Sequence, residues 1–221
     1  MNLEKHYEYF NPTKVEAPIH IVGCGAIGST VATSLARLGI SNIHLYDFDT
    51  VDPHNIANQT FNNTDIGKPK VTALKNALEL INPDIELKIH EKGYTENNIR
   101  GGYIFLCVDN IDLRRRIVEE SKLSPYVYAF FDFRMGLSDA QHYAQPNTDT
   151  GTERLLKTMD FDHDEAKANM PVSACGTNLN ILPTVQMIVA LGIANFINYI
   201  KTEQMKNVIL IDAFKPSLLE F

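Results

Sequence analysis

The sequence predicts an α/β fold, a doubly wound and mostly parallel sheet with helices on both faces. An apolar strand that begins at Ile19 runs directly into three glycines spaced Gly-x-Gly-x-x-Gly. These are Gly23, Gly25 and Gly28. A helical pattern follows them and closes at Gly39, and a second strand, Asn42 to Tyr46, ends at Asp47. A strand, a glycine turn, a helix and a second strand that ends in an acid are typical of a Rossmann-like fold.

The glycine turn indicates a phosphate site. The first glycine allows a tight turn, the second lets the backbone approach a phosphate, and the third lets the helix pack close to the strand. The N–H groups that open the helix, at about Ala26 to Thr30, would face the anion, and Asp47 is placed to hydrogen-bond a ribose hydroxyl. Small residues also recur at packed turns that bind nothing, but the surrounding strand, helix and acid favour nucleotide binding.

Composition narrows the class of protein. A chain of 221 residues with 44% hydrophobic and 21% charged residues suits one globular domain, over residues 19–221, preceded by a polar arm at residues 1–18. The net charge of −7 argues against partners such as nucleic acid or an anionic membrane. No signal peptide or apolar stretch of transmembrane length is read from the sequence, so we expect a cytoplasmic protein. Three cysteines without a Cys-x-x-Cys pair predict neither a disulfide framework nor a zinc site.

Further elements follow from periodicity and from glycine and proline breaks. Helices are expected at Pro69–Ile81, Thr95–Arg100, Leu113–Lys122, Thr152–Thr158, Asp164–Ala168 and Thr177–Ile200, the last interrupted at Pro183. Strands are expected at Ile85–His90, Tyr103–Val108, Tyr126–Phe133, Gln141–Ala144 and Asn207–Asp212, with a hairpin around Gly136. The buried strand Tyr103–Val108 delivers Asp109 and Asn110 at its carboxyl end, so Asp109 should face the same crevice as the glycines. The run Arg114–Arg116 is expected on a solvated helix face.

The order of these motifs resembles the ThiF/MoeB superfamily, the prokaryotic relatives of ubiquitin-activating enzymes, over residues 19 to about 200. The motifs are the glycine turn, Asp47-x-Asp49, the Asn-rich element His54 to Gln59, Gly67-x-Pro69-Lys70, Asn82-Pro83-Asp84 and Asp109-Asn110. The resemblance implies an adenylyltransferase that uses ATP and Mg²⁺. Its partner would be a ubiquitin-like or sulfur-carrier protein with a C-terminal Gly-Gly tail, or a peptide, whose terminal carboxylate it activates. The resemblance also implies a homodimer.

Residue roles carry over by position. Lys70 matches the family's phosphate lysine, although it could be a solvated lysine in a first helical turn, where the helix dipole disfavours a cation. Asp109 matches the magnesium ligand, and it could also serve as the N-cap of the next helix. Asp47 matches the ribose acid and Asn55 an asparagine that touches the phosphates. Ala26, Asn58 and Asn110 complete the nucleotide contacts that the resemblance implies.

Two departures from the family pattern concern positive charge. Asn58 stands where the family commonly has an arginine, and the N-terminal arm has no arginine, since the first is Arg37. Arg134 could supply the charge by its position, or it could pair with Asp132 or Asp139. The family's structural zinc, normally held by two Cys-x-x-Cys pairs, is not expected here.

The alternatives to an adenylyltransferase are two. A non-catalytic module that grips a ubiquitin-like tail would fit the missing arginines. An NAD-dependent oxidoreductase would fit the glycine turn, but it would leave Lys70 and Asp109 without a role.

Cys175 precedes the last long helix at a position where the family can form a thioester or acyl-disulfide after adenylation. A cysteine at a helix N-terminus should have a lowered thiol pKa, as a nucleophile requires. An ordinary buried cysteine is an equally good interpretation. Cys24, in the glycine turn, and Cys107, in a buried strand, are expected to be structural.

Overall fold

A computed structural model of the chain describes every residue except 97, 123, 163, 165–178 and 216. The strands are β1 (Ile19–Val22), β2 (Asn42–Tyr46), β3 (Glu86–His90), β4 (Gly102–Leu106), β5 (Val127–Met135), β6 (Asp139–Pro146), β7 (Val208–Asp212) and β8 (Ser217–Glu220). The α-helices are α1 (Ala26–Arg37), α2 (Lys70–Ile81), α3 (Ile111–Ser121), α4 (Asp149–Lys157) and α6 (Leu182–Thr202). Short 3₁₀ helices cover Pro12–Lys14, Pro53–Ala57 and Asn63–Asp65.

The eight strands found in the described residues form one sheet in the order β3-β2-β1-β4-β5-β6-β7-β8. The first five in this order are parallel, and β6, β7 and β8 continue the sheet antiparallel. The chain winds outward from β1 to β3 in one direction and from β4 onward in the other, so the order reverses between β1 and β4. The predicted doubly wound α/β fold is therefore confirmed, and ligands of such sheets bind outside the carboxyl ends of the strands at this reversal.

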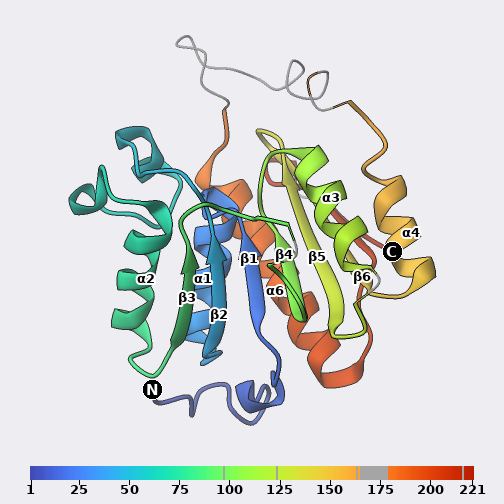
Figure 1. Cartoon of the computed structure of the whole chain (residues 1–221), viewed down its shortest axis with the longest axis horizontal. Coiled ribbons are helices and arrows are strands. Elements are labelled where there is room, and N and C mark those ends of the chain that lie inside the picture. Colours follow the sequence, from blue (N-terminus) through green and yellow to red (C-terminus); the bar gives the residue numbers. More distant parts are fainter. Residues whose placement is uncertain (97, 123, 163, 165–178, 216) are drawn as a thin grey trace.

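Helices cover both faces of the sheet. In Figure 1, α3 and α4 lie in front of the sheet, while α1 and α6 lie behind it. The apolar stripes of α1, α2 and α6 share one buried cluster with one face of the sheet, including Val31, Leu74 and Phe196. The stripes of α3 and α4, including Ile117 and Leu155, join a second cluster on the opposite face. These two cores hold the carboxyl edges of β1, β2 and β4 in a fixed relation.

The long C-terminal helix differs from two expectations based on the sequence. α6 begins at Leu182, so Pro183 lies in its first turn, where its missing N–H costs nothing, and does not interrupt it. α6 has 21 residues, and an 18-residue window within it has a mean hydropathy of 1.3. By length and composition the helix could therefore cross a membrane, contrary to the expectation from the sequence. The helix instead contacts α1, β5 and β6, and it buries Val185, Ile188 and Phe196 among them.

Other boundaries also differ from the prediction. The helix expected at Thr95–Arg100 is wrong, because the described residues there form only a turn in which the Asn98 N–H donates to the Thr95 carbonyl at 3.2 Å. α4 begins at Asp149, before the predicted Thr152, because the Thr148 side chain caps it by accepting the Gly151 N–H. β8 was not anticipated. The helix expected at Asp164–Ala168 falls almost wholly outside the described residues.

The N-terminal arm packs on the body of its own chain. Phe10 is buried in the core formed with α1 and α6, and a Cβ added at Gly39 would lie 2.6 Å from the Leu3 side chain. Figure 1 shows this segment at the end of the sheet where β1 begins, opposite the edge where β1 runs into the glycine turn.

Candidate functional site

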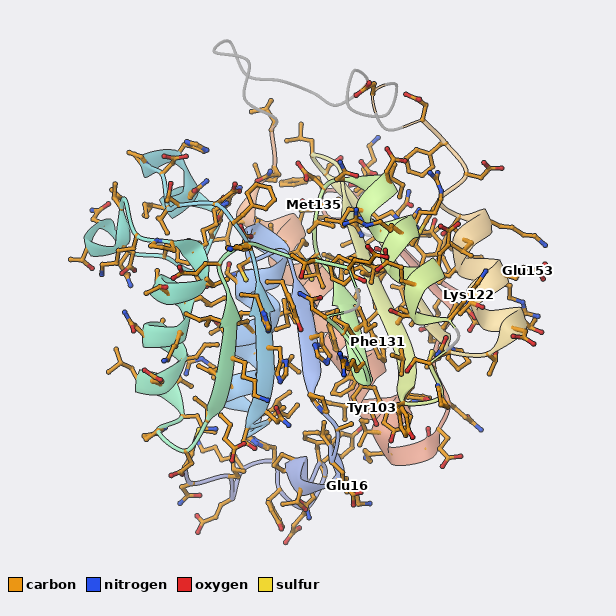
Figure 2. All side chains as sticks on the ribbon, viewed as in Figure 1. Glu16, Tyr103, Lys122, Phe131, Met135 and Glu153 are labelled. Carbon is orange, nitrogen blue, oxygen red and sulfur yellow. The ribbon has the colours of Figure 1, made fainter. Side chains whose placement is uncertain are left out.

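A cavity of about 440 Å³ opens at the carboxyl ends of β1, β2 and β4. Its lining includes Gly23, Gly25, Ala26, Asp47, Lys70, Asp109 and Asn110 from the sequence prediction. The structure therefore brings the glycine turn, the strand-terminal acids and the helix lysine together. Met135, at the end of β5, also lines the cavity, and Figure 2 shows it at the end of the sheet opposite Tyr103 and Glu16.

The glycine turn has the geometry that its three positions predict. Gly23 has φ +92°, a conformation that favours glycine. A Cβ added at Gly28 would lie 1.8 Å from the Gly23 carbonyl oxygen, so Gly28 packs α1 against the turn and does not line the cavity. A Cβ at Gly25 would meet nothing within 4 Å, because this residue borders the cavity. The turn thus leaves space in front of the first N–H groups of α1, which have no partner within the helix.

Asp47 fixes the glycine turn to the end of β2. Its Oδ2 accepts the Cys24 N–H at 2.6 Å, and its Oδ1 accepts the Asp49 N–H at 2.8 Å. Burial raises the pKa of the Asp47 carboxyl above its ordinary value, against the opposing effect of these two hydrogen bonds. Asp47 lines the cavity, where the sequence predicts that it meets a ribose. It also holds the glycine turn in place through its two hydrogen bonds.

Lys70 begins α2 and is not a solvated lysine. Its side chain is only 9% exposed, and Nζ lies 2.8 Å from Oδ2 of Asp49, whose side chain is 51% exposed. The Lys70 N–H also donates to the Asp49 carbonyl at 2.9 Å. The dipole of α2 disfavours a cation in its first turn, and the Asp49 carboxylate compensates that charge.

The capping role at the start of α3 belongs to Asn110 and not to Asp109. The Asn110 side chain accepts the Leu113 N–H at 2.8 Å. Asp109 is exposed and makes no hydrogen bond or ion pair with the residues that the structure describes, so its carboxylate is available to a ligand at the cavity.

The possible metal ligands at the cavity suit an Mg²⁺ ion that is coordinated mainly by a polyphosphate. Within the described ranges no group of three or more His, Cys, Asp or Glu residues could hold a metal. One free carboxylate, phosphate oxygens and water are a normal magnesium environment. Asp109 therefore fits the metal-ligand role.

Asn55 and Asn58, both expected at the nucleotide, do not line the cavity. Oδ1 of Asn55 accepts the Asp52 N–H at 2.9 Å within the 3₁₀ helix Pro53–Ala57. Nδ2 of Asn58 donates to the Asn180 carbonyl at 3.3 Å. Both side chains thus hold the loop beside the cavity, and the neighbouring Gln59 lines the cavity in their place.

Two arginines share the buried carboxylate of Asp132, and the sequence did not predict that Arg114 is one of them. Arg114 of α3 lines the cavity, is 5% exposed and donates to the carbonyls of Leu106 and Val108 and to the Asp132 carboxylate. Arg134 binds the other oxygen of Asp132, with Nε at 2.8 Å from Oδ2. Of the options for Arg134, pairing with Asp132 is the observed one.

The solvated face expected for Arg114–Arg116 is therefore wrong for Arg114. The signal was present in the sequence, because Arg114 follows Ile111 by three residues and precedes Ile117 by three, which places it on the buried stripe of α3.

The cysteines of the described chain are structural. Cys24 and Cys107 are free thiols, and burial raises the pKa of both well above its ordinary value. A thiol that resists deprotonation is a poor nucleophile. Cys175 lies outside the described residues.

The fold and the site define a class of doubly wound α/β proteins with a glycine turn at the sheet reversal. A family model described as the ThiF family matches residues 15–209. The chain belongs to the ThiF family.

Its relatives include ubiquitin-like modifier-activating enzyme 5 of Drosophila melanogaster, 35% identical over 134 residues that cover 53% of this chain and 32% of the relative. The enzyme of the same name from Caenorhabditis elegans is 30% identical over 118 residues, 46% of this chain and 28% of the relative. The matches thus span about a third of these curated relatives.

Solved structures share the fold. Escherichia coli MccB with ATP superposes with a TM-score of 0.74 at 19% identity, over 95% of this chain and 65% of that one. PaaA superposes with a TM-score of 0.73 at 15% identity, over 99% of this chain and 68% of that one.

Proposed function

We propose that this chain is an ATP-dependent adenylyltransferase that activates a C-terminal carboxylate. The observation that supports the proposal most directly is the single cavity lined by the glycine turn, Asp47, Lys70 and Asp109 in a ThiF-family chain. A carboxylate that attacks the α-phosphate must overcome repulsion between two anions, so such a site needs positioned donors and cations.

In the proposed step, a carboxylate oxygen of the substrate forms a bond to the α-phosphorus of ATP. The bond from that phosphorus to the bridging oxygen of the β-phosphate breaks, and pyrophosphate leaves with the electron pair. The products are an acyl-adenylate and pyrophosphate. The N–H groups at Gly25 and Ala26 bind the phosphates, Lys70 stabilises charge on the outer phosphates, and Asp47 holds the ribose. Asp109 would hold Mg²⁺, which neutralises phosphate charge when bound.

Phe48 is proposed to contact the base. Its side chain is 75% exposed although it lines the cavity, and a Cβ at Gly93 would lie 3.1 Å from the Phe48 ring. An exposed ring beside a glycine offers a flat apolar surface, and a nucleobase can stack on such a surface.

The acyl substrate is proposed to be a ubiquitin-like or sulfur-carrier protein with a Gly-Gly tail, or a peptide. The named relatives are activating enzymes for ubiquitin-like modifiers, and one solved neighbour is MccB with SeMet MccA, at a TM-score of 0.70. The same proposal has two further parts. The Cys175 thiolate attacks the carbonyl carbon of the acyl-adenylate, a thioester forms and AMP leaves with the electron pair of the broken bond. The chain also assembles with a second copy of itself.

Magnesium-dependent exchange of label between pyrophosphate and ATP tests the proposal. The assay uses candidate carriers that end in Gly-Gly and short peptides, with wild type, Lys70→Ala, Asp109→Ala and Cys175→Ala. We expect exchange by wild type and Cys175→Ala, and a loss of at least about 100-fold in the first two variants. ATP binding without exchange for any carboxylate substrate would favour the non-catalytic module, which the asparagine at position 58 also fits.

A further inference from the structure

Lys70 and Arg114, the cations that line the cavity among the described residues, are both already paired within the protein. The other charged residues of the described lining are Asp47, Asp49 and Asp109. Lys70 is paired with Asp49, and Arg114 with the buried Asp132. Among the residues that the structure describes, the lining therefore offers a polyphosphate three carboxylates and no unpaired cation. A triphosphate that takes Lys70 as a counter-charge must therefore compete with Asp49 for it.

Asp49 is built so that its side chain is the movable part of this ion pair. Its backbone is held at both ends, since its N–H donates to Asp47 and its carbonyl accepts the Lys70 N–H. An isolated antiparallel bridge between Thr50 and Pro69 fixes the next residues. The ammonium is almost fully buried, whereas half of the Asp49 side chain is exposed. The carboxylate can thus swing toward solvent while the lysine stays in place.

We propose that Asp49 is a carboxylate lock on Lys70 that makes triphosphate binding depend on a divalent cation. The inference rests on the proposed function, in which Lys70 meets the outer phosphates. A phosphate oxygen replaces Oδ2 of Asp49 at Nζ, and the released carboxylate then lies beside a polyphosphate of the same sign. A divalent cation relieves that repulsion, so metal-free ATP is disfavoured. A nucleoside monophosphate has no outer phosphates, so it binds at the glycine turn without reaching Lys70. The ion pair between Lys70 and Asp49 then stays intact. Asp49 is a positioning residue in this account.

Calorimetric titration with ATP and AMP, in EDTA and in Mg²⁺, tests the lock. Asp49→Asn keeps the shape of the side chain and removes its charge. Metal-free ATP should bind this variant at least about tenfold more tightly than wild type, because one repelling charge next to the phosphates is gone. AMP affinity should change by less than about twofold, and the gain in ATP affinity from Mg²⁺ should shrink. The control is Asp52→Asn, an exposed carboxylate of the same loop that does not line the cavity.

The same Asp49→Asn change in a Lys70→Met protein distinguishes competition for Lys70 from simple charge repulsion between Asp49 and the phosphates. In Lys70→Met the ion pair is absent, so adding Asp49→Asn should raise ATP affinity less than it does in the presence of Lys70, a non-additivity expected of groups in contact. Equal gains in both backgrounds, an unchanged ATP affinity, or equal changes for ATP and AMP would overturn the lock while leaving ATP binding intact. If wild type binds neither ATP nor AMP, the proposed function itself fails and the inference fails with it.

Discussion

Gly25 and Gly28 belong to the same turn, but Gly28 is tightly packed and Gly25 faces open space. A side chain at Gly28 would collide with the backbone of Gly23, while one at Gly25 would extend into the cavity. We therefore expect Gly28→Ala to lower the thermal midpoint by several degrees, since overpacking costs about 1–3 kcal/mol or more. Gly25→Ala should lose less stability but weaken ATP binding by at least about tenfold, because its methyl group occupies the phosphate approach.

Thermal melts and ATP titrations of the two variants check this contrast. The phosphate assignment would be contradicted if Gly25→Ala bound ATP as wild type does. The packing argument would be contradicted if Gly28→Ala melted at the wild-type temperature.

Individual residues were predictable where a motif fixes both position and chemistry. Gly23, Gly25, Asp47, Lys70 and Asp109 lie together at the cavity, as expected for residues at strand ends and helix starts, while their roles toward a nucleotide stay predictions. The partner of Lys70 was not predicted. An ion pair between residues 49 and 70 depends on the loop path between them, and no local pattern encodes that path.

At the scale of elements, one buried carboxylate joins α3 to β5. Asp132 is fully buried between Arg114 and Arg134, and Arg114 also holds the carbonyls of Leu106 and Val108, just before Asp109. Removing the charge in Asp132→Asn leaves two arginines without their counter-ion, one of them buried. We expect a loss of about 3–5 kcal/mol in unfolding free energy, the usual cost of breaking a buried ion pair.

Urea denaturation of Asp132→Asn, with the exposed Asp139→Asn as the matched control, measures this cost. A change below about 1 kcal/mol in Asp132→Asn would show that the network is not a strong link between α3 and β5.

Elements were predictable from periodicity, while their ends depended on local chemistry. The strands of the parallel part and α1, α2 and α3 were found close to their observed positions. The start of α6 was misplaced because the apolar run extends before Pro183, whereas proline is best tolerated in the first helical turn. β8 is a short strand whose one neighbour among the described strands is β7, so its conformation follows from that neighbour and not from its own pattern.

For the whole molecule, histidines of the sheet that are buried or half-buried predict acid sensitivity. His20 and His44 are cross-strand neighbours with ring centroids 4.6 Å apart, and His142 is buried on β6. Burial is the main cause that lowers the pKa of His20 to about 3, of His44 to about 4 and of His142 to about 4. A further cause for His20 is the neighbouring His44, and for His44 it is Lys88.

The direction of the pH effect follows from these shifts. The folded pKa values lie below the unfolded value of 6.5, so below pH 6.5 the unfolded chain binds more protons than the folded chain. The contribution of these histidines to stability is complete above pH 6.5 and is lost as the pH falls through the folded values of about 4 and about 3. We expect the thermal midpoint to fall by at least about 5 °C between pH 7 and pH 5.

A melting series over this pH range, for wild type and for His20→Phe, measures the effect. The variant should lose less stability on acidification. Parallel curves for the two proteins would show that His20 does not carry the effect.

We propose that the glycine turn, Lys70 and Asp109 form one triphosphate site. The most direct measurement is a crystal structure of the chain with a non-hydrolysable ATP analogue and Mg²⁺. We expect phosphates at the N–H groups of Gly25 and Ala26, Lys70 on an outer phosphate with Asp49 displaced, and the base against Phe48. An analogue bound outside this cavity, or with its phosphates away from both Lys70 and Asp109, would contradict the proposed site.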